Sequence, residues 1–351
     1  MKFNHYLSVL AFSLFLASCG DDDTGTGTAD YADVLANVGT NVFLKTYEDL
    51  KDRAIQLQNA TAALEALPNS ANLEAARAAW VAARSPWEQS EGFLFGPVDQ
   101  EGLDPSLDSW PVNVTDLNNV LASSNALTVD FLKAQEGTLK GFHTIEYLLW
   151  GTDGNKQPDT FTEREYEYLA ACAGALAADA AALYDLWSPA GGNYVKQVTD
   201  AGNGSNIYIS QKAALEEMAN GLIVIADEVA NGKINDPFSQ KDLSLEESRF
   251  SANSKADFAD NIRSIQNIYT GKYGSGGNGN GIANIIKAKN VALDARVYAE
   301  IAVAIQAIEA IPGTFSDAVF NAGTAVENAQ QQVRGLLSTL ESEVLPIISN
   351  L

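Results

Sequence analysis

Histidine and cysteine are nearly absent from this sequence. Its 351 residues include two histidines and two cysteines, and His5 lies in an N-terminal segment with the pattern of an export signal. His143 is therefore the single imidazole expected in the mature protein. This composition excludes metal sites built from several thiolates and zinc-peptidase helices that carry two histidines. Cys172 lies in an alanine-rich helical run and is expected to be a small buried side chain without a disulfide partner.

Basic residues are also scarce. Lysine and arginine total 22 against 45 aspartates and glutamates, which gives a formal net charge of -23 at pH 7. Such a surface repels nucleic acids and attracts cations, so we expect no nucleic-acid partner; solubility alone would also account for the charge. The few arginines, Arg84 and Arg263 among them, are expected to pair with buried carboxylates.

The N-terminal segment carries the marks of an exported, anchored protein. A lysine, an apolar run and small residues precede Cys19, and the run is too short to span a membrane. The ending Leu16 to Cys19 resembles a bacterial lipobox, in which the chain is cut before the cysteine and the cysteine is lipidated; an ordinary secretory signal is the alternative. We predict a lipoprotein signal peptide at 1–18, lipidation of Cys19 and a disordered acidic tether at 19–30. This places the protein in the bacterial cell envelope, anchored to the outer membrane on its periplasmic side or at the cell surface.

Sustained two-residue alternation is missing as well, so no strand or sheet is predicted. Apolar residues recur at three- and four-residue spacing from Tyr31 to Leu67, which predicts a helix. A second helix begins near Ser70, with a kink or break near Ser85 because Pro86 follows. The proline- and glycine-rich stretch 96–113 predicts an irregular segment, and a polar linker is predicted at 231–250. Further helices are predicted at about 115–122, 125–133, up to Gly151, from Thr160 or Thr162 to Trp187, and at 207–230, 255–269, 281–311 and 315–348.

The predicted fold class is therefore all-α. About 320 residues beyond the tether exceed what one core usually serves, which predicts two helical domains, 31–188 and 189–351. The stretch FHTIEYLLWG at 142–151 aligns with IRSIQNIYTG at 262–271, and this similarity suggests that the two halves are related bundles. Chance matches of this quality are also common in such helices.

One short stretch concentrates the chemistry. His143 and Glu146 are three residues apart in a predicted helix, so both side chains project from one face and can hold the same ion. Gly141 lies less than a turn away and leaves room for a close approach of another helix or a ligand. A core histidine that hydrogen-bonds to a carboxylate would give the same pattern, and this alternative stays open.

A metal at this position would need more ligands. No second histidine exists, so the others must be oxygens, as in helical bundles that bind metals with inward-facing carboxylates. The candidates that can fold back onto the His143 helix are Glu91, Asp104 and Asp108.

Several motifs together resemble the imelysin-like family. The stretch GFHTIEYLLWG at 141–151 carries a GxHxxE motif, and the pattern W-x6-W-x3-E-x3-FGP extends from Trp80 to Pro97. LDSWP at 107–111, TEREYEYLAA at 162–171 and ESRFSANS at 247–254 agree with the same family. The resemblance extends over most of the mature chain.

The resemblance implies an envelope protein made of two related helical bundles with a site in the cleft between them. It implies classification as a peptidase and also a role in iron acquisition, with iron-uptake machinery as a partner. The metal ligands that it implies are His143, Glu146, Glu91 and Asp108, and the supporting cleft residues are Gly141, Trp110, Glu247, Ser248 and Arg249.

We therefore expect a protein that binds a divalent or trivalent metal ion, such as Fe or Zn. The alternative is a metal-dependent endopeptidase in which His143 and Glu146 are catalytic, with Glu146 as ligand or as the base that activates a metal-bound water. A third possibility is an anchored interaction protein that binds no metal.

Overall fold

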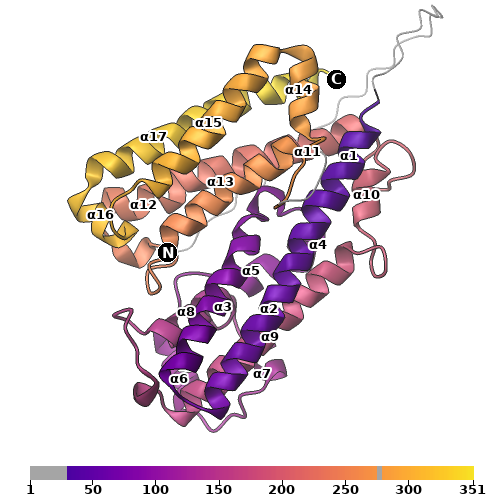
Figure 1. Ribbon diagram of the computed structural model, residues 1–351. Coiled ribbons are helices and arrows are strands. Elements are labelled where there is room, and N and C mark those ends of the chain that lie inside the picture. Colours follow the sequence, from indigo (N-terminus) through magenta and orange to yellow (C-terminus); the bar gives the residue numbers. More distant parts are fainter. Residues whose placement is uncertain (1–29, 275–278) are drawn as a thin grey trace, which may run out of the picture.

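The computed structural model describes residues 30–274 and 279–351. The predicted signal peptide and Cys19 lie outside these residues, as does the predicted tether except for its last residue. Within the described residues the protein is helical, with no strand or sheet, which confirms the predicted fold class. Figure 1 shows the long helices in two groups, and contacts between α3 (Ser70–Glu88) and α13 (Ser254–Thr270) join the groups.

The first group is built around α2 (Leu44–Ala66), which α1 (Ala32–Val38) joins through the π-helical turn η1 (Gly39–Phe43). The helices α3 and α9 (Glu163–Trp187) both pack against α2. Shorter helices complete this group: η2 (Glu91–Phe93), α4 (Pro97–Gln100), α5 (Leu103–Asp108), α6 (Val114–Ala122), α7 (Val129–Lys133), η3 (Gly137–Leu139), α8 (Gly141–Trp150) and η4 (Pro158–Thr160).

The helix α9 begins and ends as predicted. Thr162 accepts a hydrogen bond from the Glu165 amide, and the Glu165 carboxylate accepts one from the Thr162 amide, so two otherwise unpaired amides are satisfied at the start of the helix. By length and composition α9 could cross a membrane, but 61% of its most apolar window is buried inside the protein. Here it packs against α2 and the shorter helices of the first group.

The second group consists mainly of α11 (Gln211–Asp227), α13, α15 (Val291–Glu309) and α17 (Gly323–Thr339), which pack on one another in the salmon to yellow part of Figure 1. The helix α10 (Val195–Thr199) follows α9 and packs against α1 and η1 of the first group. The remaining elements of the second group are η5 (Glu228–Lys233), α12 (Asn235–Gln240), η6 (Leu243–Leu245), α14 (Ile282–Lys289), α16 (Phe315–Asn321), η7 (Leu340–Val344) and α18 (Leu345–Ser349). The predicted domain division after residue 188 stays a prediction.

The structure differs from five predictions of local structure. The stretch 96–113 contains the helices α4 and α5, because Pro97 is tolerated in the first turn of a helix. The helix α3 does not break at Ser85 and continues through Pro86 to Glu88. The predicted linker 231–250 contains α12 and η6. The predicted helix 281–311 is divided at Asn290, whose side chain caps α15, and the predicted helix 315–348 is divided into α16, α17, η7 and α18.

Candidate metal centre

Nine ionisable side chains gather where the two helix groups meet. We call them the buried charge cluster. They come from α3, η2, α5, α8, η5, α13 and the segment between η6 and α13, and each is less than 9% exposed. The cluster contains six carboxylates, two permanent cations and one imidazole: Glu88, Glu91, Asp108, Glu146, Glu247, Asp257, Arg84, Lys233 and His143.

Arg84 lies at the centre of the cluster and is fully buried. Its Nη1 pairs with Asp108, and its Nη2 lies 2.5 Å from Glu88 Oε1 and 2.9 Å from Glu247 Oε1. Its Nε is 3.5 Å from Asp257 Oδ1. One guanidinium therefore connects carboxylates from α3, α5, α13 and the segment before α13, which confirms the expectation that Arg84 pairs with buried acids.

Lys233 is the second permanent cation. Its Nζ donates to Glu91 Oε2 at 2.7 Å and to Glu247 Oε1 at 2.9 Å, and it lies 3.6 Å from Glu88 Oε2. Burial lowers the pKa of Lys233, but the surrounding carboxylates outweigh burial and raise it well above its usual value. The ammonium is therefore permanently charged, and it ties η5 of the second group to η2 of the first.

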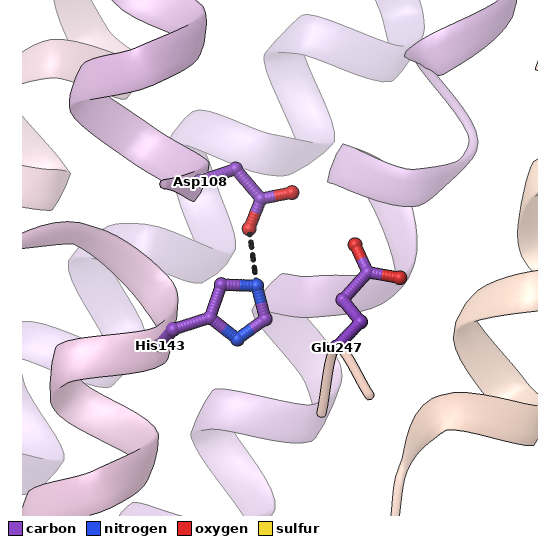
Figure 2. A group of neighbouring side chains, drawn as sticks. All are labelled: Asp108, His143 and Glu247. Atoms are coloured by element: carbon purple, nitrogen blue, oxygen red, sulfur yellow. Dashed lines mark ion pairs between the residues drawn. The ribbon is translucent and has the colours of Figure 1, made fainter. Parts of the chain in front are cut away.

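His143 contacts a carboxylate on each side of its ring. Its Nε2 lies 3.1 Å from Asp108 Oδ1, and its Nδ1 lies 3.2 Å from Glu146 Oε2. Figure 2 shows the Asp108 contact and the carboxylate of Glu247 on the same side of the ring. The other oxygen of Glu146 accepts hydrogen bonds from the Ser251 amide at 2.8 Å and the Ser251 hydroxyl at 2.7 Å. Both Glu146 oxygens are thus engaged, and Nε2 is the nitrogen that faces Asp108.

Gly141 brings these residues together. Its φ of +76° is a conformation that favours glycine, and a Cβ atom here would lie 2.3 Å from the Leu107 carbonyl oxygen. The first turn of α8 therefore lies against the last turn of α5. Asp108, the residue after Leu107, is placed beside His143 as a result.

The histidine is protonated near neutral pH. Burial and the Arg84 guanidinium lower the pKa of His143, but the carboxylates of Asp108 and Glu146 outweigh them and raise it to about 9. Burial also raises the pKa of Asp108, but Arg84 and His143 outweigh burial and hold it well below its usual range. Asp108 and His143 therefore form an ion pair.

The two permanent cations do not neutralise all the other carboxylates of the cluster. Burial raises the pKa of Glu88 well above its usual range, because Arg84 and Lys233 compensate only part of its effect. Burial and the neighbouring Glu88 carboxylate likewise raise the pKa of Glu91, and Lys233 compensates only part of the rise. Burial likewise raises the pKa of Asp257 to about 7. Six carboxylates against two permanent cations leave room for further positive charge, either as protons or as a bound cation.

The donor atoms fit a metal ion. Asp108, His143 and Glu247 offer ligand atoms that lie within 4.8 Å of one another, and so do Glu88, Glu91, Asp108 and Glu247. His143 Nε2 and Glu247 Oε2 are buried without a hydrogen-bond partner. Oxygen donors with one imidazole suit iron, manganese or zinc.

The comparisons with known proteins agree with the motifs. A sequence model described as imelysin matches residues 43–340 of this chain. The chain belongs to the imelysin family. Iron-regulated protein A of Synechococcus elongatus is 31% identical over 311 residues, which cover 88% of this chain and 84% of that protein.

Solved structures share the imelysin fold. A crystal structure from Parabacteroides distasonis, described as an iron-regulated protein A precursor, has a TM-score of 0.82 at 27% identity and covers 93% of this chain and 96% of that chain. An imelysin-like protein from Psychrobacter arcticus has a TM-score of 0.75 at 14% identity, covering 91% and 95% of the two chains, and this likeness concerns the fold alone.

The imelysin motif residues occupy different positions relative to the cluster. Glu91, Asp108, His143, Glu146 and Glu247 are members of it. Among the supporting residues, Trp110 packs at the border of the cluster, with its ring centroid 5.9 Å from that of His143 and 5.6 Å from Lys233 Nζ. Ser248 is buried next to Glu247, whereas the guanidinium of Arg249 stacks on Phe250 and makes no ion pair with a described cluster residue.

Sequence reasoning missed three ionisable members, Glu88, Lys233 and Asp257. Glu88 follows Arg84 by four residues on α3, a spacing that places the two side chains together. Lys233 lies in the stretch predicted as a linker, and nothing in its local sequence indicates burial. Asn261 of α13 also escaped notice; its amide donates to Glu88 Oε2 at 2.6 Å and to Glu91 Oε2 at 2.9 Å.

Proposed function

We propose that this protein binds one metal ion through Asp108, His143 and Glu247. The observation that carries the proposal is the convergence of these ligand atoms within 4.8 Å. Glu247 Oε2 and His143 Nε2 are buried without a hydrogen bond, and the ion pair with Asp108 is the one close contact of Nε2 among the described residues. Buried polar atoms without partners are unfavourable, and one cation would satisfy both.

The surroundings of the histidine support the same conclusion. A histidine that binds a metal usually donates its other ring nitrogen to a carboxylate or carbonyl, which fixes the orientation of the ring. Glu146 accepts from Nδ1 in this way, at 3.2 Å. We therefore assign Glu146 an orienting role, and Glu91 a place beside Lys233 at the edge of the site.

Iron is the metal we propose first. Carboxylates and one imidazole suit Fe²⁺ as well as Mn²⁺ and Zn²⁺, and two relatives carry names that refer to iron regulation. Iron acquisition is then the process in which the protein takes part, with the uptake machinery of the cell as its partner.

Burial favours binding over peptide hydrolysis. The side chains of His143 and Glu146 are 1% and 0% exposed, whereas a peptidase must bring a peptide bond to the metal-bound water. Access of a single ion to such a buried cluster requires a smaller opening than access of a polypeptide.

We also propose that the protein is a lipoprotein of the cell envelope, anchored to the outer membrane through Cys19. The lipobox-like sequence before Cys19 supports this proposal. Mass spectrometry of the membrane-extracted protein tests it: a chain that begins at a lipid-modified Cys19 is expected, and a chain cleaved elsewhere without lipid would contradict it.

Metal binding is tested with the purified protein and Fe²⁺ under anaerobic conditions, with Mn²⁺ and Zn²⁺ in parallel. Bound metal is measured by elemental mass spectrometry and affinity by calorimetry. We expect about one ion per chain, and a loss of at least about tenfold in affinity in His143→Ala and in Glu247→Gln. Glu309→Gln, which removes a carboxylate whose side chain is 50% exposed, is the matched control and should bind as the unmodified protein does.

Two results would contradict the proposal. Equal metal content in His143→Ala and the unmodified protein would place the metal elsewhere. Chelator-sensitive cleavage of an unfolded protein substrate that His143→Ala abolishes would replace the binding function with the endopeptidase alternative.

A further inference from the structure

The loop 200–210, between α10 and α11, exposes two isoleucines. The side chain of Ile209 is 88% exposed and that of Ile207 is 50% exposed, whereas Tyr208 between them is 5% exposed. The loop therefore directs one aromatic side chain into the protein and two branched aliphatic side chains outward. Single exposed apolar residues are ordinary, but two on one loop tip are a candidate contact surface.

Hydrogen bonds hold this loop in one conformation. The Ser205 hydroxyl accepts from the amides of Ile207 and Tyr208, at 3.2 and 2.9 Å, and Gln197 Oε1 accepts from the Asn206 amide at 2.8 Å. The Gly202 amide donates to the Tyr208 carbonyl at 3.0 Å. The isoleucines are thus held outward by a structured backbone, and they need not be reorganised before they contact a partner.

The predicted tether leaves the protein beside this loop. Gln211, two residues after Ile209, accepts a hydrogen bond from the Tyr31 amide at 2.7 Å and donates one to Asp30 Oδ1 at 2.8 Å. Cys19 precedes Asp30 by eleven residues, a length that spans at most about 40 Å when fully extended. A lipid on Cys19 would therefore keep loop 200–210 within about 40 Å of the bilayer surface.

We propose that loop 200–210 docks on the membrane that anchors the chain, with Ile207 and Ile209 inserted between the lipid headgroups. The proposal rests on the predicted anchor, which supplies the proximity, and it is independent of the metal site. The surface around the loop carries both signs, with Lys196 3.7 Å from Asp200, and the whole chain is strongly acidic. The lipid surface that fits is zwitterionic, because anionic lipid would be repelled.

The test replaces the lipid by an N-terminal hexahistidine tag, so it does not depend on lipidation of Cys19. The protein tested is the Cys19→Ser variant of residues 19–351, which include every described residue. Its tag binds it to phosphatidylcholine vesicles that carry a nickel-chelating lipid. Ile209→Cys is labelled with an environment-sensitive nitrobenzoxadiazole; Cys172 is buried and will not react. The control label is at Phe320→Cys, a side chain that is 56% exposed. It belongs to α16, a helix that lies on the opposite side of the molecule from α1 in Figure 1.

We expect a several-fold rise in fluorescence at position 209 on vesicle attachment, reversed when imidazole releases the protein, and no rise at position 320. An unchanged signal at 209 on bound protein, or equal rises at both positions, would overturn the proposal. A rise at 209 without vesicles that grows with protein concentration would also overturn it, because the loop would then contact a second copy of the chain.

A second measurement uses unlabelled protein and therefore excludes artefacts of the fluorescent label. The untagged chain is sedimented with phosphatidylcholine vesicles, and the double variant Ile207→Ser/Ile209→Ser should partition roughly tenfold to hundredfold more weakly than the unmodified chain. Equal partitioning of the two chains would contradict insertion of the isoleucines.

Discussion

The Nε2 atom of His143 lies 3.1 Å from Oδ1 of Asp108, across the junction between α8 and α5. The two residues are 35 positions apart in the chain, and their contact depends on the absence of a side chain at Gly141. A residue without functional groups therefore controls the distance between two proposed metal ligands.

Gly141→Ala is expected to destabilise the protein and to weaken metal binding. The new Cβ would lie 2.3 Å from the Leu107 carbonyl oxygen in a backbone with φ of +76°, and strain and overpacking together should lower the free energy of unfolding by about 3 kcal/mol. Urea unfolding measures this change.

The control is Gly335→Ala. Gly335 lies within α17, and an added Cβ there would meet nothing within 4 Å. This substitution should leave the unfolding free energy unchanged or raise it by up to about 1 kcal/mol, because alanine favours the helix more than glycine does. Equal effects of the two substitutions would show that the close approach at Gly141 has no special role.

Arg84→Met is expected to be severely destabilising. It leaves four buried carboxylates, from Glu88, Asp108, Glu247 and Asp257, without their shared guanidinium, and breaking a buried ion pair from one side typically costs about 3–5 kcal/mol. Arg296→Met removes an exposed arginine that pairs with Glu343 and should hardly change the urea midpoint. An Arg84→Met protein as stable as the unmodified one would mean that the acids are neutralised by protons alone.

Without metal, stability should fall as pH rises through the His143 titration. The pKa of His143 is about 9 in the folded protein, and about 6.5 is usual in an unfolded chain. Because the folded state holds the proton more tightly, the stabilisation is complete below pH 6.5, decreases between pH 6.5 and 9, and is lost above pH 9.

The change is on the order of 3 kcal/mol, and it is measured as the difference in unfolding free energy between the unmodified protein and His143→Gln at each pH. A pH-independent difference would mean that the imidazole is neutral in the folded protein. Chelator is present throughout, since a bound metal would replace the proton on Nε2.

Lys233→Met is expected to increase the gain in stability that the protein obtains from a bound divalent cation. The substitution removes the ammonium that lies 2.7 Å from Glu91 and 2.9 Å from Glu247, so the metal-free protein should lose on the order of 3 kcal/mol of stability. Divalent cations should restore much of it, because Glu88, Glu91, Asp108 and Glu247 then have room for a second ion. Thermal unfolding with and without Mn²⁺ measures the effect, and a loss that no cation reverses would contradict this prediction.

Local signals in the sequence were sufficient to predict some structural elements and not others. The start of α9 was predictable because the Thr162 cap and Glu165 interact within one turn. The pairing of His143 and Glu146 follows from helical spacing, and the motif resemblance correctly indicated that Asp108 lies nearby.

The remaining parts depend on contacts between distant segments. Lys233 and Glu91 are 142 residues apart, and Lys233 lies in a polar stretch that does not differ from a surface loop in composition. The helices α4 and α5 lie in a stretch rich in glycine and proline, whose packing against α8 and α9 overrides weak local preference. Proximity of this kind cannot be read from periodicity.

The buried charge cluster also constrains the order in which the chain can fold. Arg84, Glu88, Glu91 and Asp108 are synthesised early, whereas Lys233 and Glu247 follow more than a hundred residues later. Until they arrive, the amino-terminal helices must leave unbalanced charges in contact with water, so their final packing waits for the carboxyl-terminal part. A fragment that ends before Lys233 should therefore stay loosely packed and sensitive to proteases, and folding of the two helix groups should be completed in a single late step.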